Sequence, residues 1–271
     1  AIGEETLGKA LALAQRFHGR PDSRTGVQLA AHAPDTCSTP FLKRIAEAAS
    51  RTGLRVQTHV AQSKVEVARI RDRDGCTPPE LLDSVGLLND HLVGAHCIHL
   101  TDSDIARIGR AGLHVAHIPK GNATGGTIAP TRRLVDAGAK LTLATDNMHA
   151  DMIEVLRWAL CMGRVQTGRV EESWQPEHML HAATEAGAEA MGMAGEIGRI
   201  EPGYRADLVA LDLRRPHLVP HNDPLGTLVH TGMGRDVSHV VVEGEVVVAE
   251  GRPTRCDMHQ VIRDGAAAAA A

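Results

Sequence analysis

The sequence predicts an α/β fold built on a parallel sheet, of the barrel type in which active groups gather at one end of the strands. Two observations support this prediction. Short apolar runs alternate with helix-like segments between residues 27 and 145, and such alternation is typical of a parallel sheet covered on its faces. In addition, several apolar runs stop on a residue that can bind a metal or move a proton, which a buried strand has no reason of its own to do.

Four of the apolar runs end in this way. They lead into His59, His96, His117 and Asp146. A parallel barrel places its active groups at the C-terminal ends of its strands. We therefore expect these four side chains to converge on one site.

The expected elements follow one another in chain order. The helix expected at 4–17 has apolar residues at helical spacing along one face. Pro40 opens the next helix, 40–51, where a missing N–H costs nothing, and Gly53 lies where a helix C-cap favours glycine. The other expected helices are 64–73, 79–85, 102–110, 130–137, 151–164 and 176–191, and the expected parallel strands are 27–31, 55–59, 92–95, 113–116 and 141–145.

The sequence changes character near residue 197. A turn cluster at 198–203 is followed by short strands, two of which are joined by a tight turn at Gly244. These strands are expected at 206–212, 237–242 and 245–248. We expect three parts: a barrel portion at 1–197, a small β-domain segment at 198–265 and an uninformative alanine tail at 266–271.

Composition excludes several classes of function. The chain has 271 residues, 43% of them apolar, which is enough material for one sizeable core. A net charge of -4 offers no basic field for nucleic acid, and no apolar run reaches the roughly 20 residues of a membrane span. Five cysteines without a CxxC pair favour a reducing, cytoplasmic setting. The chain opens on Ala1 without a signal peptide, like the middle of a longer polypeptide.

His59 and Asp146 are the expected metal ligands. Alone, each has an ordinary explanation, since a strand-end histidine is often structural and Asp146 could cap the next segment. Together with the other strand-end residues, an imidazole and a carboxylate suit zinc, iron or manganese. Three or four protein ligands and one open position would make a bound water acidic enough to attack at neutral pH.

Other residues are candidates for the same site. His96 could orient or deprotonate the attacking water, or polarise the substrate. The amide of Gln62 could bind a substrate but cannot shuttle protons. Further rim candidates, for which solvated loop residues are an equally open interpretation, are His32, His117, Asn122 and Lys120. We interpret His99 and His149 as structural or surface histidines.

These segments resemble a known family. The runs 58–62 and 95–100, the loop 117–119 with Asn122, and the run 145–147 resemble the strand 5 to strand 8 motifs of the amidohydrolase superfamily. The resemblance is to its cytosine/guanine deaminase and triazine-hydrolase branch. The segment 198–209 is similar to the one with which those enzymes return to a small β-domain.

The resemblance implies a metal-bearing TIM barrel, of which this chain holds strands 4–8, and part of a small β-sandwich domain. It implies that His59 and Asp146 bind the metal, that His96 assists the water and that Asp146 takes its proton. It also implies that His32, on the loop after strand 4, contacts the substrate.

Two departures from the family pattern matter. The His-x-His motif of strand 1 is absent, and five βα units cannot close an eight-stranded barrel without leaving strand edges unpaired. We therefore expect this sequence to be the C-terminal part of a longer polypeptide. The second departure is Gln62, which stands where the deaminases carry a glutamate that protonates the leaving nitrogen.

Three hypotheses follow for function. The first is a metal-dependent hydrolase acting on C–N bonds other than peptide bonds, in which metal-bound hydroxide attacks a carbon of a small nitrogen heterocycle, with hydrolytic deamination as the reaction. The second is ring opening of a cyclic amide or urea, or dechlorination, at the same site, which Gln62 favours. The third is a non-catalytic binding protein with a degenerate metal site. One divalent metal, zinc before iron or manganese, and a homo-oligomer are expected.

Overall fold

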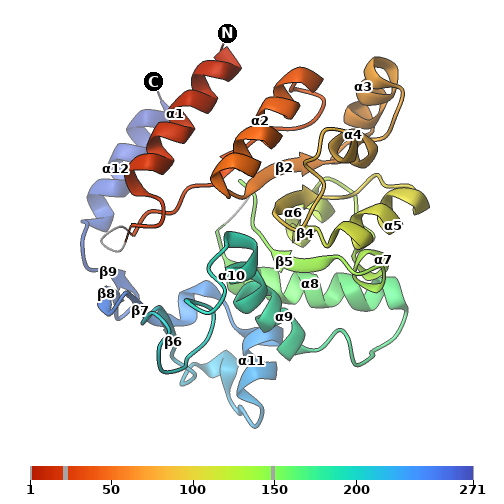
Figure 1. Ribbon diagram of the computed structural model, residues 1–271. Coiled ribbons are helices and arrows are strands. Elements are labelled where there is room, and N and C mark those ends of the chain that lie inside the picture. The colour runs from red at the N-terminus through yellow and green to blue at the C-terminus, as the bar shows by residue number, and fades with distance from the viewer. Residues whose placement is uncertain (1, 21–23, 148–149, 271) are drawn as a thin grey trace.

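A computed structural model describes residues 2–20, 24–147 and 150–270, so His149 lies outside the described residues. Its centre is a five-stranded parallel sheet whose strands follow chain order (Figure 1). The strands are β1 (Leu29–Ala30), β2 (Val56–Val60), β3 (Leu92–His96), β4 (His114–His117) and β5 (Lys140–Leu143). The predicted α/β class with a parallel sheet is confirmed.

The strand register brings the C-terminal strand ends to one edge of the sheet. Val60 of β2 pairs with His96 of β3, and His117 of β4 pairs with Leu143 of β5. Residues that follow these strands therefore start from neighbouring points. The same edge carries the polar residues that the sequence places at strand ends.

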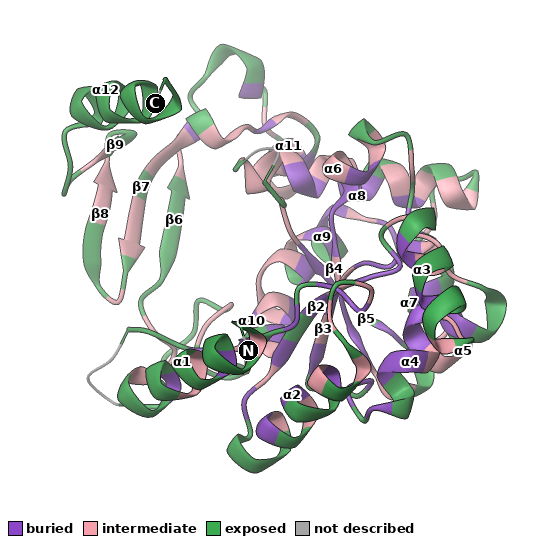
Figure 2. Cartoon of the chain, turned by 90° about the horizontal axis from the view of Figure 1, so that it is seen from above, coloured by how far each residue is buried: buried purple, intermediate pink, exposed green. Residues whose placement is uncertain are grey.

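Helices surround the strands, and their buried faces point inward toward the sheet (Figure 2). The helices are α1 (Ile2–Phe17), α2 (Thr39–Thr52), α3 (Lys64–Asp74), α4 (Pro78–Ser84), α5 (Asp102–Ala111), α6 (Pro119–Thr124), α7 (Thr131–Asp136) and α8 (Met152–Thr167). As expected, α2 has Pro40 in its first turn and ends at Gly53, whose φ of 71° is left-handed. The short helix α6 occupies a stretch expected to be a loop.

The prediction of a single helix at 176–191 is wrong, because the helix is broken in the middle. The structure has two helices there, α9 (Pro176–Ala183) and α10 (Glu185–Met191), separated by Thr184 with φ -117° and ψ -86°. The break lets α9 pack on α8 and α10 pack on β5. The two helices also contact each other, and α9 contacts β5 as well.

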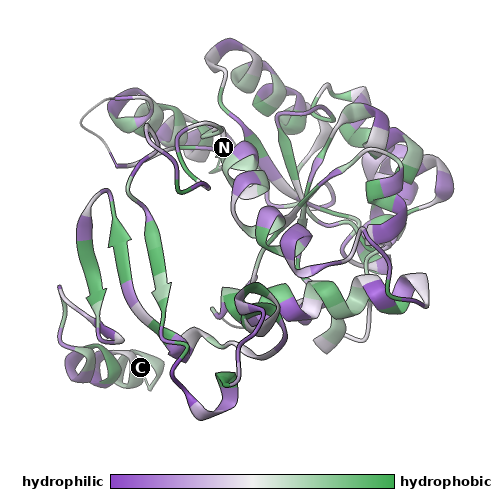
Figure 3. Cartoon of the chain, turned by 90° about the horizontal axis from the view of Figure 1, so that it is seen from below, coloured by the Kyte–Doolittle hydropathy of each residue, from purple (hydrophilic) through white to green (hydrophobic). Residues whose placement is uncertain are grey.

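The C-terminal part forms a second, antiparallel sheet, in the order β6 (Leu208–Leu211), β7 (Val237–Val242), β8 (Glu245–Ala249) and β9 (Arg252–Pro253). The predicted tight turn joins β7 to β8 through Glu243 and Gly244, both with positive φ. This sheet stands beside the parallel one, and its strands are rich in apolar residues (Figure 3). The sequence did not indicate α11 (Pro224–Thr231) or α12 (Met258–Ala269), and α12 takes up most of the alanine run.

Two apolar cores hold the parallel sheet and its helices together. The larger lies between β1–β4 and helices α1 to α5. The smaller joins Leu143 of β5 to α8, α9 and α11 around Trp174, which is 2% exposed. No helix among the described residues has both the length and the apolar character that a membrane crossing requires. All five cysteines are free thiols.

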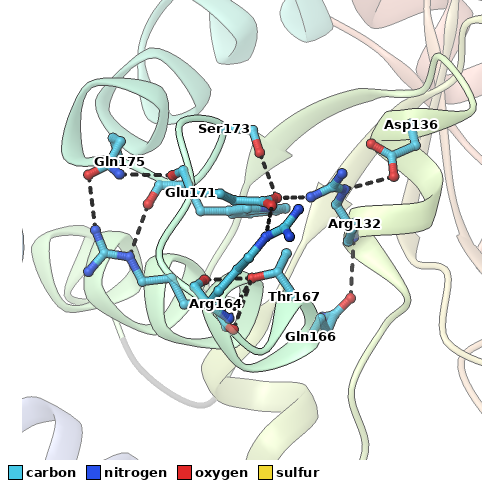
Figure 4. Close-up of polar contacts among 10 residues, drawn as sticks. Arg132, Asp136, Arg164, Gln166, Thr167, Glu171, Ser173 and Gln175 are labelled. Atoms are coloured by element: carbon cyan, nitrogen blue, oxygen red, sulfur yellow. Dashed lines mark hydrogen bonds and ion pairs between the residues drawn. The ribbon is translucent and has the colours of Figure 1, made fainter.

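A polar network fixes the connection between α8 and α9 (Figure 4). Arg164 donates to the carbonyl of Trp174 at 3.1 Å and to Gln175 Oε1 at 3.1 Å. Arg132 on α7 pairs with Asp136 at 2.7 Å and also contacts Glu171. Arg132 thus helps to hold this connection in place.

Candidate active site

Three strand ends bring their polar residues to one place. His59 is the fourth residue of β2, His96 is the last residue of β3, and Asp146 follows β5 by three residues. The rings of His59 and His96 stack with centroids 5.4 Å apart and an interplanar angle of 20°. His96 Nε2 lies 3.6 Å from Asp146 Oδ2. His96 therefore lies next to both of the expected metal ligands.

The ring of His96 is held by Asn122. Its Nδ1 lies 2.9 Å from Asn122 Oδ1, and both side chains are buried. An amide oxygen only accepts, so this contact assigns the ring proton to Nδ1 and leaves the lone pair of Nε2 facing Asp146. Among the described residues, His96 Nε2 has no hydrogen-bond partner, nor has Asn122 Nδ2. These two buried atoms are free to meet a ligand.

His59 is oriented from the neighbouring strand. Its backbone N–H donates to the carbonyl of His32 at 3.1 Å, and its ring Nδ1 contacts the same oxygen closely. The rings of His32 and His59 lie 4.9 Å apart at 52°. Since Nδ1 is engaged with the carbonyl, Nε2 is the ring nitrogen of His59 that remains for a ligand.

The backbone at these strand ends is strained. Among the described residues, six that are not glycine have positive φ, and four of them are Ala61, His96, Cys97 and Asp146. A left-handed conformation is costly for residues that carry a Cβ, and such strain gathers at functional sites. The strain independently marks the same edge of the sheet.

A pocket of about 590 Å³ opens at this edge. Its lining residues come from the ends of β2, β3 and β5 and from α6. They are Gln62, Ser63, Lys64, His96, Ile98, His99, Gly121, Asn122, Thr124, Gly125, Thr127, Asp146 and Asn147. Four of the residues expected at the site, Gln62, His96, Asn122 and Asp146, therefore share one cavity.

Other expected residues lie elsewhere. His117 is 1% exposed and does not line this pocket, and neither of its ring nitrogens has a hydrogen-bond partner in the part of the chain that the structure describes. His32 lines a neighbouring cavity of about 880 Å³ beside α1 and α2. Lys120, a rim candidate, pairs with Glu154 at 2.6 Å. Sequence reasoning missed the pocket residues Ser63 and Lys64, although Ser63 is a recognisable helix N-cap directly after Gln62.

Burial lowers the pKa of His96, and the proximity of His59 adds to that lowering, against the opposing effects of its bond to Asn122 and of Asp146. His96 is therefore neutral at physiological pH. A neutral ring can accept a proton or bind a metal ion, whereas a charged ring can do neither.

His117 makes the stability of the protein depend on pH. Burial lowers its pKa from 6.5 to about 3. Between these values the unfolded chain binds a proton at this ring and the folded chain does not, so the free energy of unfolding falls as pH falls below 6.5. We expect a loss of about 1 kcal/mol per pH unit from this residue. Urea denaturation at a series of pH values measures it.

The matched variants are His117→Gln and His91→Gln, because His117 is buried and His91 is exposed. The first should make the acid dependence less steep, leaving the part that comes from the buried His114, whose pKa burial lowers to about 4, and the second should leave it unchanged. Equal slopes in all three proteins would contradict the assignment to His117.

The donor types at the strand ends fit zinc, which binds imidazole nitrogen and carboxylate oxygen. The buried, unpartnered His96 Nε2 is the kind of atom that a ligand satisfies. Within residues 2–20, 24–147 and 150–270, no group of three or more His, Cys, Asp and Glu side chains forms a metal cluster. The described residues thus offer donors of the right type without a complete ligand set.

Fold and site together define a protein of the TIM-barrel type with its polar centre at the strand ends. The sequence pattern of the Amidohydrolase family matches residues 3–247, and the chain belongs to this family. The resemblance seen in the sequence is confirmed.

Relatives of the chain include named deaminases. It is 35% identical over 263 residues to the 5-methylthioadenosine/S-adenosylhomocysteine deaminase of Moorella thermoacetica, covering 94% of this chain and 60% of that protein. It is also 35% identical over 243 residues to the 5'-deoxyadenosine deaminase of Methanopyrus kandleri, covering 87% of this chain and 56% of that protein.

Solved structures of the same fold contain zinc. An adenosine deaminase from Xanthomonas campestris with bound zinc has a TM-score of 0.91 at 26% identity, over 97% of this chain and 61% of that one. The atrazine chlorohydrolase TrzN from Arthrobacter aurescens TC1, complexed with zinc, has a TM-score of 0.88 at 24% identity, over 98% and 60%, a likeness that shows the fold alone. The chain spans between 56% and 61% of the lengths of these four proteins.

Proposed function

We propose that this chain forms the catalytic edge of a metal-dependent hydrolase that deaminates a small nitrogen heterocycle. The observation that carries the proposal is the position of His96, with Asp146 facing its free Nε2 and His59 stacked on its ring. The deaminase names of the relatives support the same reaction. Adenosine derivatives are the substrates to test first.

The proposal includes a place for the sheet in a larger barrel. Strands β1 to β5 would be strands 4–8 of an eight-stranded barrel, with β1 and β5 at the edges of the present sheet. Edge strands have unpaired N–H and C=O groups, which three further strands would pair. In the family pattern, the first of those strands would also carry the His-x-His motif. The sheet β6–β9 would belong to a small β-domain at 198–265.

In this proposal His59 and Asp146 hold one divalent metal ion, zinc before iron or manganese. The ion, when bound, would lower the pKa of water at the site and polarise the substrate. The fixed Nδ1 of His59 supports its role, because a metal-binding imidazole is oriented by a bond to its other nitrogen.

The chain's own residues would move the protons. In deamination a C–O bond forms to water and the C–N bond to the amino group breaks, so ammonia leaves only after the nitrogen gains a proton. Asp146 is placed to take the proton of water and pass it on, and His96 can accept one at Nε2. Asn122 keeps the Nδ1 proton of His96 in place.

Substrate contacts would come from the lining of the pocket. Gln62 and Asn122 present amides that can both donate to and accept from the edge of a heterocycle. His32 and His117 are proposed as further substrate contacts. Neither lines the pocket, so a contact requires that the ligand or neighbouring strands extend the site toward them. A hydrogen-bonding site rejects analogues that leave its buried polar groups unpaired.

A second function is favoured by Gln62 itself. Its amide lines the pocket where the family's deaminases carry an acid, and an amide cannot protonate a leaving amine. A leaving group that needs less protonation would suit this site. Ring opening of a cyclic amide or urea, or dechlorination, is therefore the alternative reaction.

Gln62→Glu separates the two reactions. We expect the substitution to raise kcat/KM for aminated substrates relative to chlorinated ones by about tenfold or more, because a carboxylic acid can deliver the proton. Competition between an adenosine derivative and a chlorotriazine measures the ratio. An unchanged ratio would show that residue 62 does not choose the leaving group.

The proposed function is tested by metal content and ammonia release. The full-length protein is purified, and its bound metals are determined by elemental analysis. Ammonia release is assayed with adenosine, 5'-methylthioadenosine and 5'-deoxyadenosine. One divalent metal per chain that His59→Ala loses, together with ammonia release, supports the proposal. Full activity without metal, or a metal-free protein that only binds these compounds, would reject it.

A further inference from the structure

A buried carboxylate lies next to the pocket and has no part in the proposed chemistry. Glu66, on the first turn of α3, is 3% exposed. Its Oε1 accepts from the backbone N–H of Ala61 at 2.7 Å, and its Oε2 accepts from that of Gln62 at 2.7 Å. Both oxygens of this carboxylate therefore bind the backbone directly behind the pocket.

The backbone that Glu66 binds is the strained turn that follows β2. Ala61 has a φ of 49°, a conformation that costs energy for a residue with a Cβ. The carbonyls of this turn are bound from the other side, since Val60 O accepts from Cys97 N–H at 3.0 Å and Ala61 O accepts from His99 N–H at 2.9 Å. Two successive amides that converge on one anion form a stable concave arrangement. The carboxylate of Glu66 thus accepts the hydrogen bonds of the turn's N–H groups, while other backbone groups bind its carbonyls.

Glu66 is itself firmly placed. Its backbone N–H donates to the side chain of Ser63, the N-cap of α3, at 3.1 Å. Hydrogen bonds thus connect the N-terminus of α3, the carboxylate of Glu66 and the turn after β2. Any displacement of the carboxylate would be passed to Gln62, which is the next pocket residue along the chain.

The geometry does not make Glu66 a proton donor to the substrate. It does not line the pocket, and backbone amides occupy both of its oxygens. Burial raises its pKa, while its bonds to Gln62 and Ala61 oppose that rise. The group acts on the pocket only through the turn.

We propose that Glu66 is a positioning residue that holds Gln62 in the geometry the substrate requires. This inference rests on the proposed function of the pocket. Partners that orient a site residue change affinity or activity by about 10- to 100-fold when they are removed.

The test compares Glu66→Gln with a matched variant, Asp104→Asn. Asp104 is also buried, at 1% exposure, and also accepts from a backbone N–H, that of Thr101 at 2.9 Å, but it lies outside the pocket. In Glu66→Gln one acceptor oxygen becomes an NH₂ group that opposes a backbone donor. We expect kcat/KM to fall about 10- to 100-fold in Glu66→Gln, with metal content unchanged, and to stay within about threefold of wild type in Asp104→Asn.

A double-mutant cycle with Gln62→Ala distinguishes positioning from general destabilisation. If Glu66 acts through Gln62, adding Glu66→Gln to Gln62→Ala should lower kcat/KM by much less than it does alone. Glu66→Asp, which keeps both acceptor oxygens on a shorter side chain, should recover part of the lost activity. Additive losses, or equal losses in Asp104→Asn, would overturn the proposal.

Amide hydrogen exchange gives a readout that needs no substrate. Glu66→Gln should speed exchange at Ala61 and Gln62, and Asp104→Asn should not. Unchanged exchange at these two amides would overturn the positioning role. If exchange changes as expected but no ammonia is released from any substrate by the wild type, the positioning role stands and the proposed function fails.

Discussion

Replacing Asp146 by asparagine should lower kcat/KM for deamination by about a thousandfold, within the range that a positioned acid–base group contributes. The substitution removes the negative charge that faces His96 Nε2 at 3.6 Å and the carboxylate proposed to take the proton of water and pass it on. Asparagine adopts the left-handed backbone of residue 146, φ 61°, as readily as aspartate does. The fold should therefore persist, and steady-state ammonia release with elemental analysis measures the loss.

The matched control is His91→Gln. His91 directly precedes β3, whereas His96 ends it, so the two histidines lie at opposite ends of the same strand. Groups at the N-terminal strand ends of such a barrel contribute to stability, not to chemistry. His91→Gln should keep kcat/KM near the wild-type value. Comparable activity in Asp146→Asn and wild type would contradict the catalytic role of the carboxylate.

The proximity of His59 and His96 could be predicted from the sequence, and the reason is physical. In a parallel sheet every strand delivers its last residue to the same edge, so apolar runs that end on His59 and His96 must bring these rings together. Their stacking at 5.4 Å agrees with that expectation. No detail of side-chain packing was needed to predict it.

Side-chain burial could not be predicted in the same way. His117 ends its strand as His96 does, but its ring is buried and has no hydrogen-bond partner among residues 2–20, 24–147 and 150–270. The reach of Glu66 back to the turn after β2 depends on the angle at which α3 leaves the strand. The break at Thr184 depends on which neighbours the two halves of the helix meet. Such features are set by contacts between elements, which a single sequence does not specify.

Glycine positions show how tightly these elements pack, and Gly109→Ala is expected to have the largest effect on stability. A Cβ at Gly109, in the last turn of α5, would lie 2.0 Å from the carbonyl oxygen of Ala137 at the end of α7. Backbone cannot move aside as a flexible side chain can. We expect a loss of about 2 kcal/mol or more in the free energy of unfolding, since overpacking outweighs the gain in helix propensity.

Gly8→Ala supplies the matched comparison, because Gly8 is also inside a helix, α1, and a Cβ there would meet nothing within 4 Å. Helix propensity alone should then act, and the variant should gain about 1 kcal/mol. Chemical denaturation of both variants measures the difference. Opposite signs would show that close contact between α5 and α7 requires glycine at residue 109. A gain in both variants would mean that α5 and α7 lie farther apart than the structure places them.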